Sequence, residues 1–288
     1  MQQRNVATQG RLARGMHVIA VSGGKGGTGK TTVAVNLATA LTEAGRRVLL
    51  LDGDLGLANV DVLLGLTPAG TLQQVLQGER SLEEIILRSS EGLSVIPAAS
   101  GVARMARLDQ QELAGIVRAF GALPGDYDTL LIDTAPGIGE SVLAFCQAAQ
   151  HQLLVIRNEP ASLTDAYALI KTLSQERRVR RFRVLVNMAR AGSEPHNLFR
   201  RLQRVTDRFL DVALEYAGEI PDDDGVARAV RAQRTVLAAY PGGPAARAYH
   251  RLANAALAWM PPGEAPAGIQ FFFEQMLARP PARLKVVK

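Results

Sequence analysis

The chain has 288 residues, of which 47% are hydrophobic and 21% are charged, and this balance excludes a largely disordered protein. It contains no run of 18 apolar residues and no apolar segment near its start, so we expect neither a membrane-spanning helix nor a secretory signal. Cys146 is the single cysteine and the four histidines are scattered, which excludes a disulfide framework or a cysteine-rich metal site within one chain. We therefore expect a cytoplasmic protein.

The net charge of +6 is concentrated at the two ends of the chain. Residues 1–15 hold three Arg and no acid, and residues 268–288 have a net charge of +3, whereas the residues between them are balanced. Within that middle part, ten Arg and only two acids lie between Arg177 and Arg208. Basic tails and patches favour acidic partners such as anionic lipid, nucleic acid or an acidic protein face, although a solvated surface explains the middle cluster equally well.

Short apolar runs rich in β-branched residues alternate with segments of helical periodicity along most of the chain. This alternation predicts an α/β fold, with a mostly parallel, twisted sheet that has helices on both faces. Residues 16–260 would form this domain, between a flexible basic tail (1–15) and a Pro/Gly-rich linker (261–268). We expect strands at 17–22, 47–51, 93–96, 129–132, 153–156, 183–186 and 213–220, and helices at 30–44, 109–120, 141–150, 162–175, 197–209 and 245–259.

A glycine-rich loop lies between the first predicted strand and the first predicted helix. Its sequence from Gly24 to Thr31, GKGGTGKT, has the spacing of a phosphate-binding P-loop. The loop N–H groups and the helix N-terminus would bind phosphate, Lys30 would reach the β- and γ-phosphates, and Thr31 would ligate Mg²⁺. The expected nucleotide-binding residues of this loop are Gly24, Lys25, Gly26, Gly27, Thr28, Gly29, Lys30, Thr31 and Thr32.

Acidic residues follow two of the predicted strands, at the edge of the sheet where ligands bind in open α/β folds. Asp52 and Asp54 come after the strand at 47–51, and this pair suits Mg²⁺ binding and the positioning of water. Asp133 ends the strand at 129–132, as an acid aimed at metal-bound water does in P-loop enzymes. The expected metal ligands are Thr31, Asp52 and Asp133, and the expected switch residues after them are Thr134 and Gly137.

Two further segments bear on the choice of base. Asn187 ends the strand at 183–186, and its carboxamide can pair with the donors and acceptors of adenine. The sequence NMAR that begins there lacks the acid of the guanine-binding N-K-x-D motif, which favours ATP over GTP. Pro221, Asp222 and Asp223 follow the last strand, and they form either an adenine-side loop or an ordinary Pro-Asp turn.

The loop sequence GKGGTGKTT resembles the deviant Walker A motif of the MinD/ParA-type ATPases. Segments that nucleotide chemistry does not need, such as LDGDLGLANVDVLLGLTP (51–68) and NLFRRLQRVTDRFLDVALEYAGEIP (197–221), resemble the FlhG/FleN group, which limits flagellar number. The resemblance implies that Lys25 crosses a dimer interface to the partner's nucleotide, whereas the residues alone also allow a solvated loop charge. It also implies that Asp54 activates the attacking water, so that Lys25, Lys30 and Asp54 are the catalytic residues.

This resemblance implies a slow, Mg²⁺-dependent ATP hydrolase that cycles between a monomer and an ATP-bound homodimer and restrains a FleQ-type flagellar transcriptional activator. The FlhF GTPase is a further candidate partner. However, residues 8–14 keep only Gln9 and Arg14 of the D-Q-A-x-x-L-R element with which some relatives stimulate FlhF, so we do not expect that activity. A ParA-type DNA-partitioning ATPase and a MinD-type division-site regulator remain alternatives, because they share the same catalytic residues. Direct DNA binding is left open.

The segment at 269–279 has the pattern of an amphipathic helix and precedes a basic tail at 280–288. Such a helix either packs back onto the domain or lies on an anionic membrane surface. The resemblance favours the membrane, and so predicts reversible association with the inner face of the cell membrane. The apolar residues that share one face of this helix are Ile269, Phe272, Phe273, Met276 and Leu277.

Overall fold

The structure is a computed structural model that describes residues 16–54, 59–71, 74–75, 77–97, 119–120, 123, 127–190, 192 and 194–260. The predicted basic tails, the linker and the amphipathic helix at 269–279 lie outside the described residues. The predicted helix at 109–120 also lies outside them, except for its last two residues.

The described residues form an eight-stranded sheet in the order β3-β4-β2-β5-β1-β6-β7-β8. Neighbouring strands are parallel throughout, except for the short β3, which is antiparallel to β4. The mostly parallel sheet that the sequence predicts is therefore confirmed. The strands are β1 (His17–Ser22), β2 (Val48–Gly53), β3 (Leu87–Arg88), β4 (Ser94–Ile96), β5 (Thr129–Thr134), β6 (His151–Ile156), β7 (Arg181–Ala189) and β8 (Ala213–Pro221).

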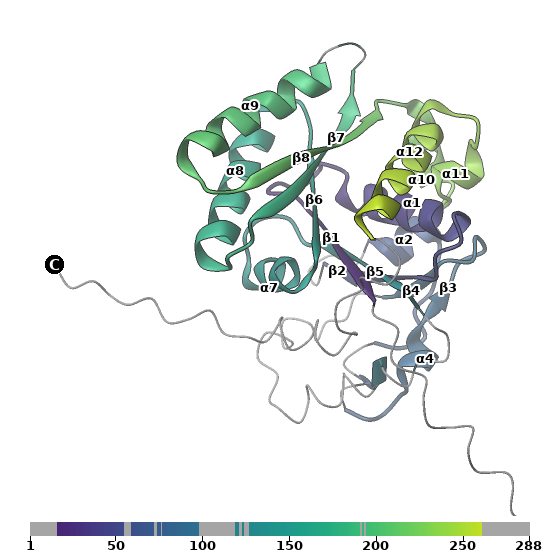
Figure 1. Cartoon of the computed structure of the whole chain (residues 1–288). Helices are drawn as coiled ribbons and strands as arrows, with labels where there is room; N and C mark the ends of the chain where they lie inside the picture. Colours follow the sequence, from purple (N-terminus) through teal and green to yellow (C-terminus); the bar gives the residue numbers. More distant parts are fainter. Residues whose placement is uncertain are drawn as a thin grey trace, which may run out of the picture.

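Helices cover both faces of the sheet (Figure 1). On one face lie α7 (Glu140–Ala148), α8 (Pro160–Glu176) and α9 (Glu194–Phe209), and the short α4 (Leu82–Ile85) packs into the same core. The opposite face carries α1 (Lys30–Glu43), α2 (Val60–Leu64), α10 (Asp224–Arg231), α11 (Val236–Ala239) and α12 (Pro244–Trp259). The four helices α2, α4, α10 and α11 and the short strand β3 have no counterpart among the predicted elements.

The central strand shows why the sheet needs a helical layer on each side. All six residues of β1 are buried, and its side chains alternate between the two cores. Val18 and Ala20 belong to the core under α7, α8 and α9, whereas Ile19 and Val21 belong to the core under α1 and α12. Such continuous apolar strands are typical of parallel sheets that are covered on both faces.

Strand order reverses at β1, because β2 and β5 lie on one side of it and β6 to β8 on the other. Ligands of open α/β folds bind at such a reversal, beyond the carboxyl ends of the strands. The loop between β1 and α1, which contains the glycine-rich motif, lies at this point.

Helix α12 runs from the carboxyl edge of the sheet to the opposite, amino edge. At its start, the Ala245 N–H donates to the Asp223 carboxylate, just after β8, at 3.1 Å. At its end, the Trp259 ring lies under the Arg183 guanidinium, near the start of β7, with 4.6 Å between the guanidinium carbon and the ring centre. The His151 ring, at the start of β6, lies 6.5 Å from the Trp259 ring. Its Nδ1 accepts a hydrogen bond from the Arg183 guanidinium at 3.2 Å.

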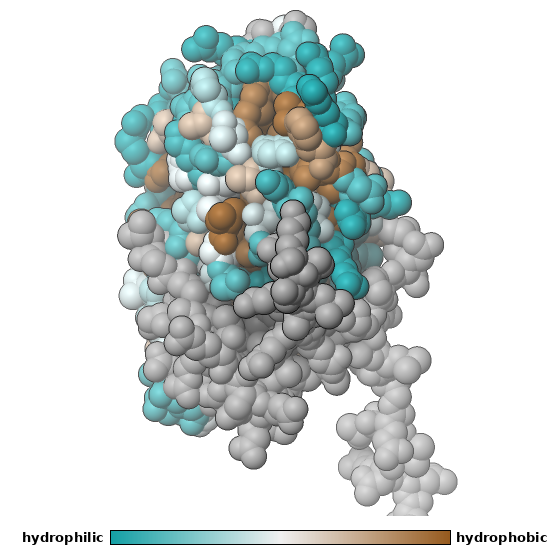
Figure 2. Space-filling model, turned by 90° about the vertical axis from the view of Figure 1, so that its left-hand side faces the viewer, coloured by the Kyte–Doolittle hydropathy of each residue, from teal (hydrophilic) through white to brown (hydrophobic). Residues whose placement is uncertain are grey.

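No helix in the described part of the chain has the length and apolar character that crossing a bilayer requires. Figure 2 shows the side of the molecule that carries α8 and α9, where hydrophilic residues cover much of the upper part and hydrophobic residues form smaller patches between them.

Candidate functional site

The loop between β1 and α1 is tightly constrained by glycines. Gly27 and Gly29 have left-handed backbone conformations, with φ of 78° and 84°, which side chains disfavour. A Cβ atom on Gly29 would lie 2.3 Å from the Asn187 amide nitrogen, and one on Gly24 would lie 2.2 Å from the Asp165 carbonyl oxygen. The loop therefore fits between β7 and α8 only with glycine at Gly24 and Gly29.

A cavity of about 500 Å³ opens above this loop, which is within the size range of small-molecule sites. It brings together residues from the glycine-rich loop, from the segments that follow β2 and β5, and from α2 and α10. Its lining residues are Gly26, Gly27, Gly29, Lys30, Thr31, Thr32, Asp54, Asn59, Val62, Leu63, Thr134, Pro136, Val230 and Gln233.

Lys30 is the cation of this cavity. Only 6% of the residue is exposed, and its ammonium donates to the Lys25 carbonyl oxygen at 3.1 Å. Burial lowers the pKa of Lys30, and the carboxylates of Asp133 and Asp54 oppose that shift. An anion in the cavity would compensate for the lost hydration of this ammonium, so the cavity is suited to a phosphate group.

Asp133 ends β5 and is fully buried. Within the described part of the chain, neither oxygen of its carboxylate has a hydrogen-bond partner. Burial raises its pKa to about 7; the hydroxyl of Thr31 and the ammonium of Lys30 oppose the shift, and Asp52 adds to it. A buried carboxylate with free oxygens beside a phosphate cavity is suited to a cation or to metal-bound water.

Asp52 has a different environment from Asp133, its neighbour across the β2–β5 pair. One of its oxygens accepts the N–H of Asp54 at 3.0 Å, and the other accepts those of Asn59 and Val60 at 3.1 and 3.2 Å. These bonds fix the start of α2 and the backbone at Asp54, which lines the cavity. The contacts favour an organising role for Asp52, whereas the sequence predicts a metal ligand, and that prediction stays open.

The predicted switch segment follows β5 and lies against the glycine-rich loop. The Thr134 hydroxyl donates to the Val21 carbonyl oxygen at 3.1 Å, and the Gly137 N–H donates to the Gly23 carbonyl oxygen at 3.3 Å. Gly137 has a φ of 94°, and a Cβ atom there would meet no neighbour within 4 Å, so its glycine is required by backbone conformation rather than by space.

A second cavity, of about 290 Å³, adjoins the first, because Thr32 and Val230 line both. It contains all four residues that the sequence assigns to the base side. Its lining residues are Thr32, Asn187, Met188, Ile220, Pro221, Asp222, Asp223, Val226, Ala227, Val230 and Tyr249.

Two of these base-side residues also form hydrogen bonds with backbone groups of neighbouring segments. Asn187 donates from its amide nitrogen to the Thr28 carbonyl oxygen at 2.8 Å, which ties β7 to the glycine-rich loop. The two oxygens of Asp223 accept the N–H groups of Gly225 and Ala245 at 2.7 and 3.1 Å, and so cap α10 and anchor α12. Asp223 is therefore a helix cap in this structure, and the choice between an adenine-side loop and an ordinary Pro-Asp turn stays open.

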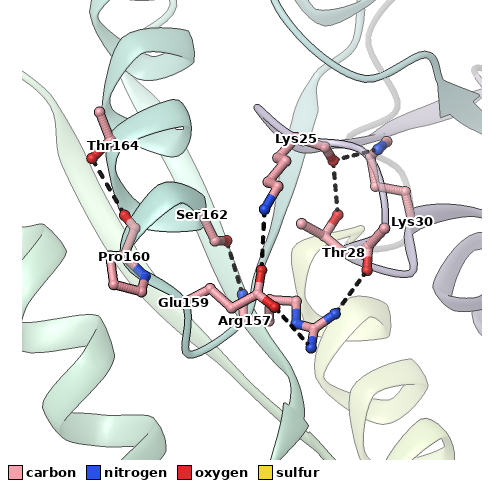
Figure 3. A network of polar contacts seen from close by, with 9 residues as sticks. Lys25, Thr28, Lys30, Arg157, Glu159, Pro160, Ser162 and Thr164 are labelled. Atoms are coloured by element: carbon pink, nitrogen blue, oxygen red, sulfur yellow. Dashed lines mark hydrogen bonds and ion pairs between the residues drawn. The ribbon is translucent and has the colours of Figure 1, made fainter.

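Lys25 lines neither cavity in the described structure. Its ammonium instead forms an ion pair with Glu159, at 3.3 Å, at the residue before α8 (Figure 3). Arg157 contacts the other oxygen of Glu159 at 3.0 Å and donates to the Gly27 carbonyl oxygen at 3.3 Å (Figure 3). Lys25 and the glycine-rich loop are thus connected to the segment that follows β6.

Several residues that line these cavities or support their walls carry no recognisable sequence signal. Arg157 and Glu159 lie 130 and 134 residues from Gly27 and Lys25, so no local pattern reveals these contacts. Met188 has a positive φ of 52°, which is uncommon for a side chain of its size, and no sequence motif predicts it. Tyr249 belongs to the apolar pattern of α12, which predicts a core residue and gives no sign of the cavity.

The arginine-rich segment contributes little to the site. Four of its ten Arg lie in α9, whose buried residues include Leu198, Phe199 and Leu202. The exposed residues of the helix include Arg200, Arg201, Arg204 and Arg208, so these charges point away from the core and line neither cavity. The alternatives of a solvated face and an acidic partner stay open.

Comparisons with known proteins agree with this geometry. A family model described as an AAA domain matches residues 16–183. The chain is 50% identical to antiactivator FleN of Pseudomonas aeruginosa over 265 residues, which cover 92% of this chain and 95% of that protein. It is 31% identical to the flagellum site-determining protein YlxH of Helicobacter pylori over 264 residues, covering 90% of this chain and 89% of that one.

Among solved structures, the septum site-determining protein MinD of Pyrococcus horikoshii, complexed with Mg-ADP, superimposes with a TM-score of 0.63. It is 28% identical, and the match covers 84% of this chain and 97% of that one. The sheet order and the glycine-rich loop at the strand reversal define the P-loop NTPase fold class. The chain belongs to the MinD/ParA family, within the group that contains antiactivator FleN and the FlhG/YlxH proteins.

Proposed function

We propose that the chain is a Mg²⁺-dependent ATPase that cycles between a monomer and an ATP-bound dimer and limits flagellar number by restraining a FleQ-type transcriptional activator. The observation that carries this proposal is the 50% identity to an antiactivator over nearly the whole of both chains. A second relative is a flagellum site-determining protein, which supports the flagellar assignment.

The residues present fit a nucleotide with Mg²⁺. Asp133 supplies an unpaired buried carboxylate, and the Thr31 hydroxyl lies close enough to lower the pKa of Asp133. Mg²⁺ keeps several waters and binds through one or two protein ligands together with substrate phosphates, so it does not need a cage of protein ligands. Thr31 and Asp133 would hold the ion, with Asp52 supporting the neighbouring backbone. When bound, Mg²⁺ would neutralise charge on the phosphates.

The chain's own residues would then divide the work as follows. The loop from Gly24 to Thr32 wraps the phosphates, and Lys30 binds the β- and γ-phosphates. Asp54, at the wall of the cavity, orients the attacking water and takes up its proton. Lys25 leaves Glu159 and contacts the nucleotide of the partner subunit, so that two subunits close only when both hold ATP. Loss of the γ-phosphate releases the segment at Thr134 and Gly137 and loosens the dimer.

The base would occupy the second cavity, beside Asn187 and the segment from Pro221 to Asp223. The guanine-binding acid is absent after Asn187, so we expect ATP to bind more tightly than GTP. The helix at 269–279 would attach the ATP-bound dimer to the inner face of the cell membrane, because two copies bind a surface more strongly than one.

The proposal is tested by deleting the gene and counting flagella and flagellar transcripts per cell. We expect both to rise, and the wild-type chain to restore them while the Lys30→Ala variant does not. In a reconstituted system, the purified chain with ATP should bind the activator and lower its activity. Unchanged flagellar number together with defective plasmid partition or septum placement would instead support one of the two alternative functions.

A further inference from the structure

The carbonyl groups of the glycine-rich loop are held by side chains outside the backbone of the loop. Four of the six residues in the segment GKGGTG (24–29) are glycine, so ordering this loop costs much conformational entropy. The Lys25 carbonyl accepts from the Lys30 ammonium at 3.1 Å, and the Thr28 carbonyl accepts from the Asn187 amide at 2.8 Å. Both donors belong to residues that the sequence already assigns to the nucleotide site.

The Gly27 carbonyl, by contrast, accepts from a residue that no motif contains. Arg157, the first residue after β6, donates to it from the guanidinium at 3.3 Å (Figure 3). The guanidinium also pairs with Glu159 at 3.0 Å, and the Arg157 N–H donates to the Ser162 hydroxyl at 3.1 Å. Arg157 is thus fixed at its backbone and at the end of its side chain, and it contacts the loop without lining either cavity.

The contact with Arg157 sets the direction of a backbone N–H group as well as that of a carbonyl. The Gly27 carbonyl and the Thr28 N–H belong to one planar, trans peptide unit, so they point in opposite directions. Figure 3 shows Arg157 on one side of the loop and the contact between Lys30 and the Lys25 carbonyl on the other. Because the Gly27 carbonyl is turned toward Arg157, the Thr28 N–H is turned toward the side on which the Lys30 ammonium lies.

We infer that Arg157 is a positioning residue, which holds this peptide unit so that the Thr28 N–H donates to a phosphate oxygen of the nucleotide. The inference rests on the proposed nucleotide-binding function and adds to it a residue from outside the P-loop. A loop whose N–H groups already have the bound orientation loses less entropy when the ligand binds, so the ligand binds more tightly. A guanidinium suits this role, because its planar fork donates to the Gly27 carbonyl and to Glu159 at once.

The experiment compares wild type, Arg157→Ala and Arg180→Ala by calorimetric titration with ADP and with inorganic tripolyphosphate. ADP lacks the γ-phosphate that the proposed dimer requires, so it reports on the loop of one subunit. Arg180 is the matched control, because its guanidinium also donates to a backbone carbonyl, that of Asp211 at 2.9 Å, and pairs with the same residue's carboxylate, but near the start of β7. We expect both ligands to bind about three- to tenfold more weakly to Arg157→Ala, and to Arg180→Ala as to wild type.

Two further measurements separate positioning from a general loss of structure or of positive charge. In ATP hydrolysis by Arg157→Ala, KM should rise by about the same factor while kcat stays within about twofold, because the Thr28 N–H contacts phosphate before and during the reaction. In amide NMR spectra, the Thr28 proton should shift downfield when ADP binds to wild type, as for an N–H that donates to an anion, and should shift less in Arg157→Ala.

The inference is overturned if Arg157→Ala binds both ligands with wild-type affinity, or if Arg180→Ala weakens binding as much. It is also overturned if the Thr28 amide proton shifts equally in wild type and Arg157→Ala, since the arginine then acts without orienting this peptide unit. A wild-type protein that binds neither ligand refutes the proposed function itself, and this inference with it.

Discussion

Lys25 and Glu159 form an ion pair within one subunit, although the family resemblance places this lysine at the nucleotide of the other subunit. The same lysine cannot serve both contacts at once. Arg157 also pairs with Glu159, so the acid would keep one cationic partner after Lys25 leaves. The intramolecular pair therefore competes with the proposed dimer contact.

We expect Glu159→Gln to favour ATP-dependent dimerisation, because Lys25 loses its competing partner. The ion pair is partly exposed and contributes only a few tenths to about 1 kcal/mol in each subunit. A symmetric dimer breaks two such pairs, so the dimerisation constant should rise about three- to thirtyfold. Sedimentation at several protein concentrations measures it, with Glu83→Gln on the exposed surface of α4 as the control. Lys25→Ala should prevent the ATP-dependent dimer, and a variant that dimerises normally would remove the cross-subunit role.

Lys30→Ala should weaken ATP binding by about 100-fold, since hydrogen bonds to charged groups are the stronger class and the cavity loses its buried cation. Lys171→Ala is the control, because that lysine lies exposed on α8 and lines neither cavity. Calorimetry with ATP and Mg²⁺ measures both. Equal affinities for the two variants would contradict the phosphate-binding assignment.

Asp54→Ala should separate binding from turnover. We expect ATP binding and dimerisation to remain and hydrolysis to slow by at least about 100-fold, the usual scale for a lost general base. Phosphate release under saturating ATP measures the rate. A matched control is Asp61→Asn, at the start of α2, whose carboxylate lies outside the cavity lining. Rapid hydrolysis by Asp54→Ala would assign the water to another residue.

The pH dependence of stability should report on His151. Burial, together with the nearby charges of Arg183 and His17, lowers its pKa from 6.5 to about 4. The unfolded chain therefore binds a proton more readily than the folded one, so stability falls as the pH decreases from about 6.5 to about 4. The contribution is on the order of 3 kcal/mol at most. In the His151→Gln variant, the free energy of unfolding should depend less on pH between about 6.5 and about 4.

The matched control for that measurement is His250→Gln, because His250 is partly exposed and lies beside Glu43 rather than at the buried edge of the sheet. Its stability profile between pH 4 and 6.5 should follow that of wild type. A His151→Gln variant with the same profile would show that this histidine does not set the acid limit.

Membrane association should depend on residues 269–279. With ATP and vesicles that contain anionic lipid, the wild type should co-sediment, whereas a Phe272→Glu/Phe273→Glu variant and Lys30→Ala should stay in solution. The double variant loses two apolar anchors and gains repulsion from the lipid charge. Neutral vesicles serve as the control for the charge contribution. If the double variant pellets as well as the wild type, another part of the chain is the anchor.

The sequence was sufficient for the features that follow from local patterns. The alternation of apolar strands and helices predicted seven of the eight strands, and the glycine-rich motif predicted the loop at the strand reversal. Short elements such as α4 and α11 were missed, because four residues are too few to show a helical period, although Ser81 and Thr235 do cap them.

Contacts between segments that are distant in the sequence could not be predicted from local patterns. Asp52 and Asp223 have the residue types of ligand-binding acids, but their oxygens are occupied by backbone N–H groups whose positions only the folded chain defines. In the same way, the apolar pattern of α12 explains why Tyr249 is buried, and only the packing of α12 against β8 and α10 reveals the cavity beside it.

The course of α12 has a consequence for how the protein would sit at a membrane. The helix begins beside Asp223 and ends at Trp259, and its 16 residues span about 24 Å, so the chain passes residue 260 at the far side of the domain from the nucleotide. A bilayer that holds residues 269–279 close to residue 260 would face the amino ends of the strands. In that arrangement the nucleotide entrance would point away from the lipid, so that exchange of ATP and approach of a protein partner would not require release from the membrane.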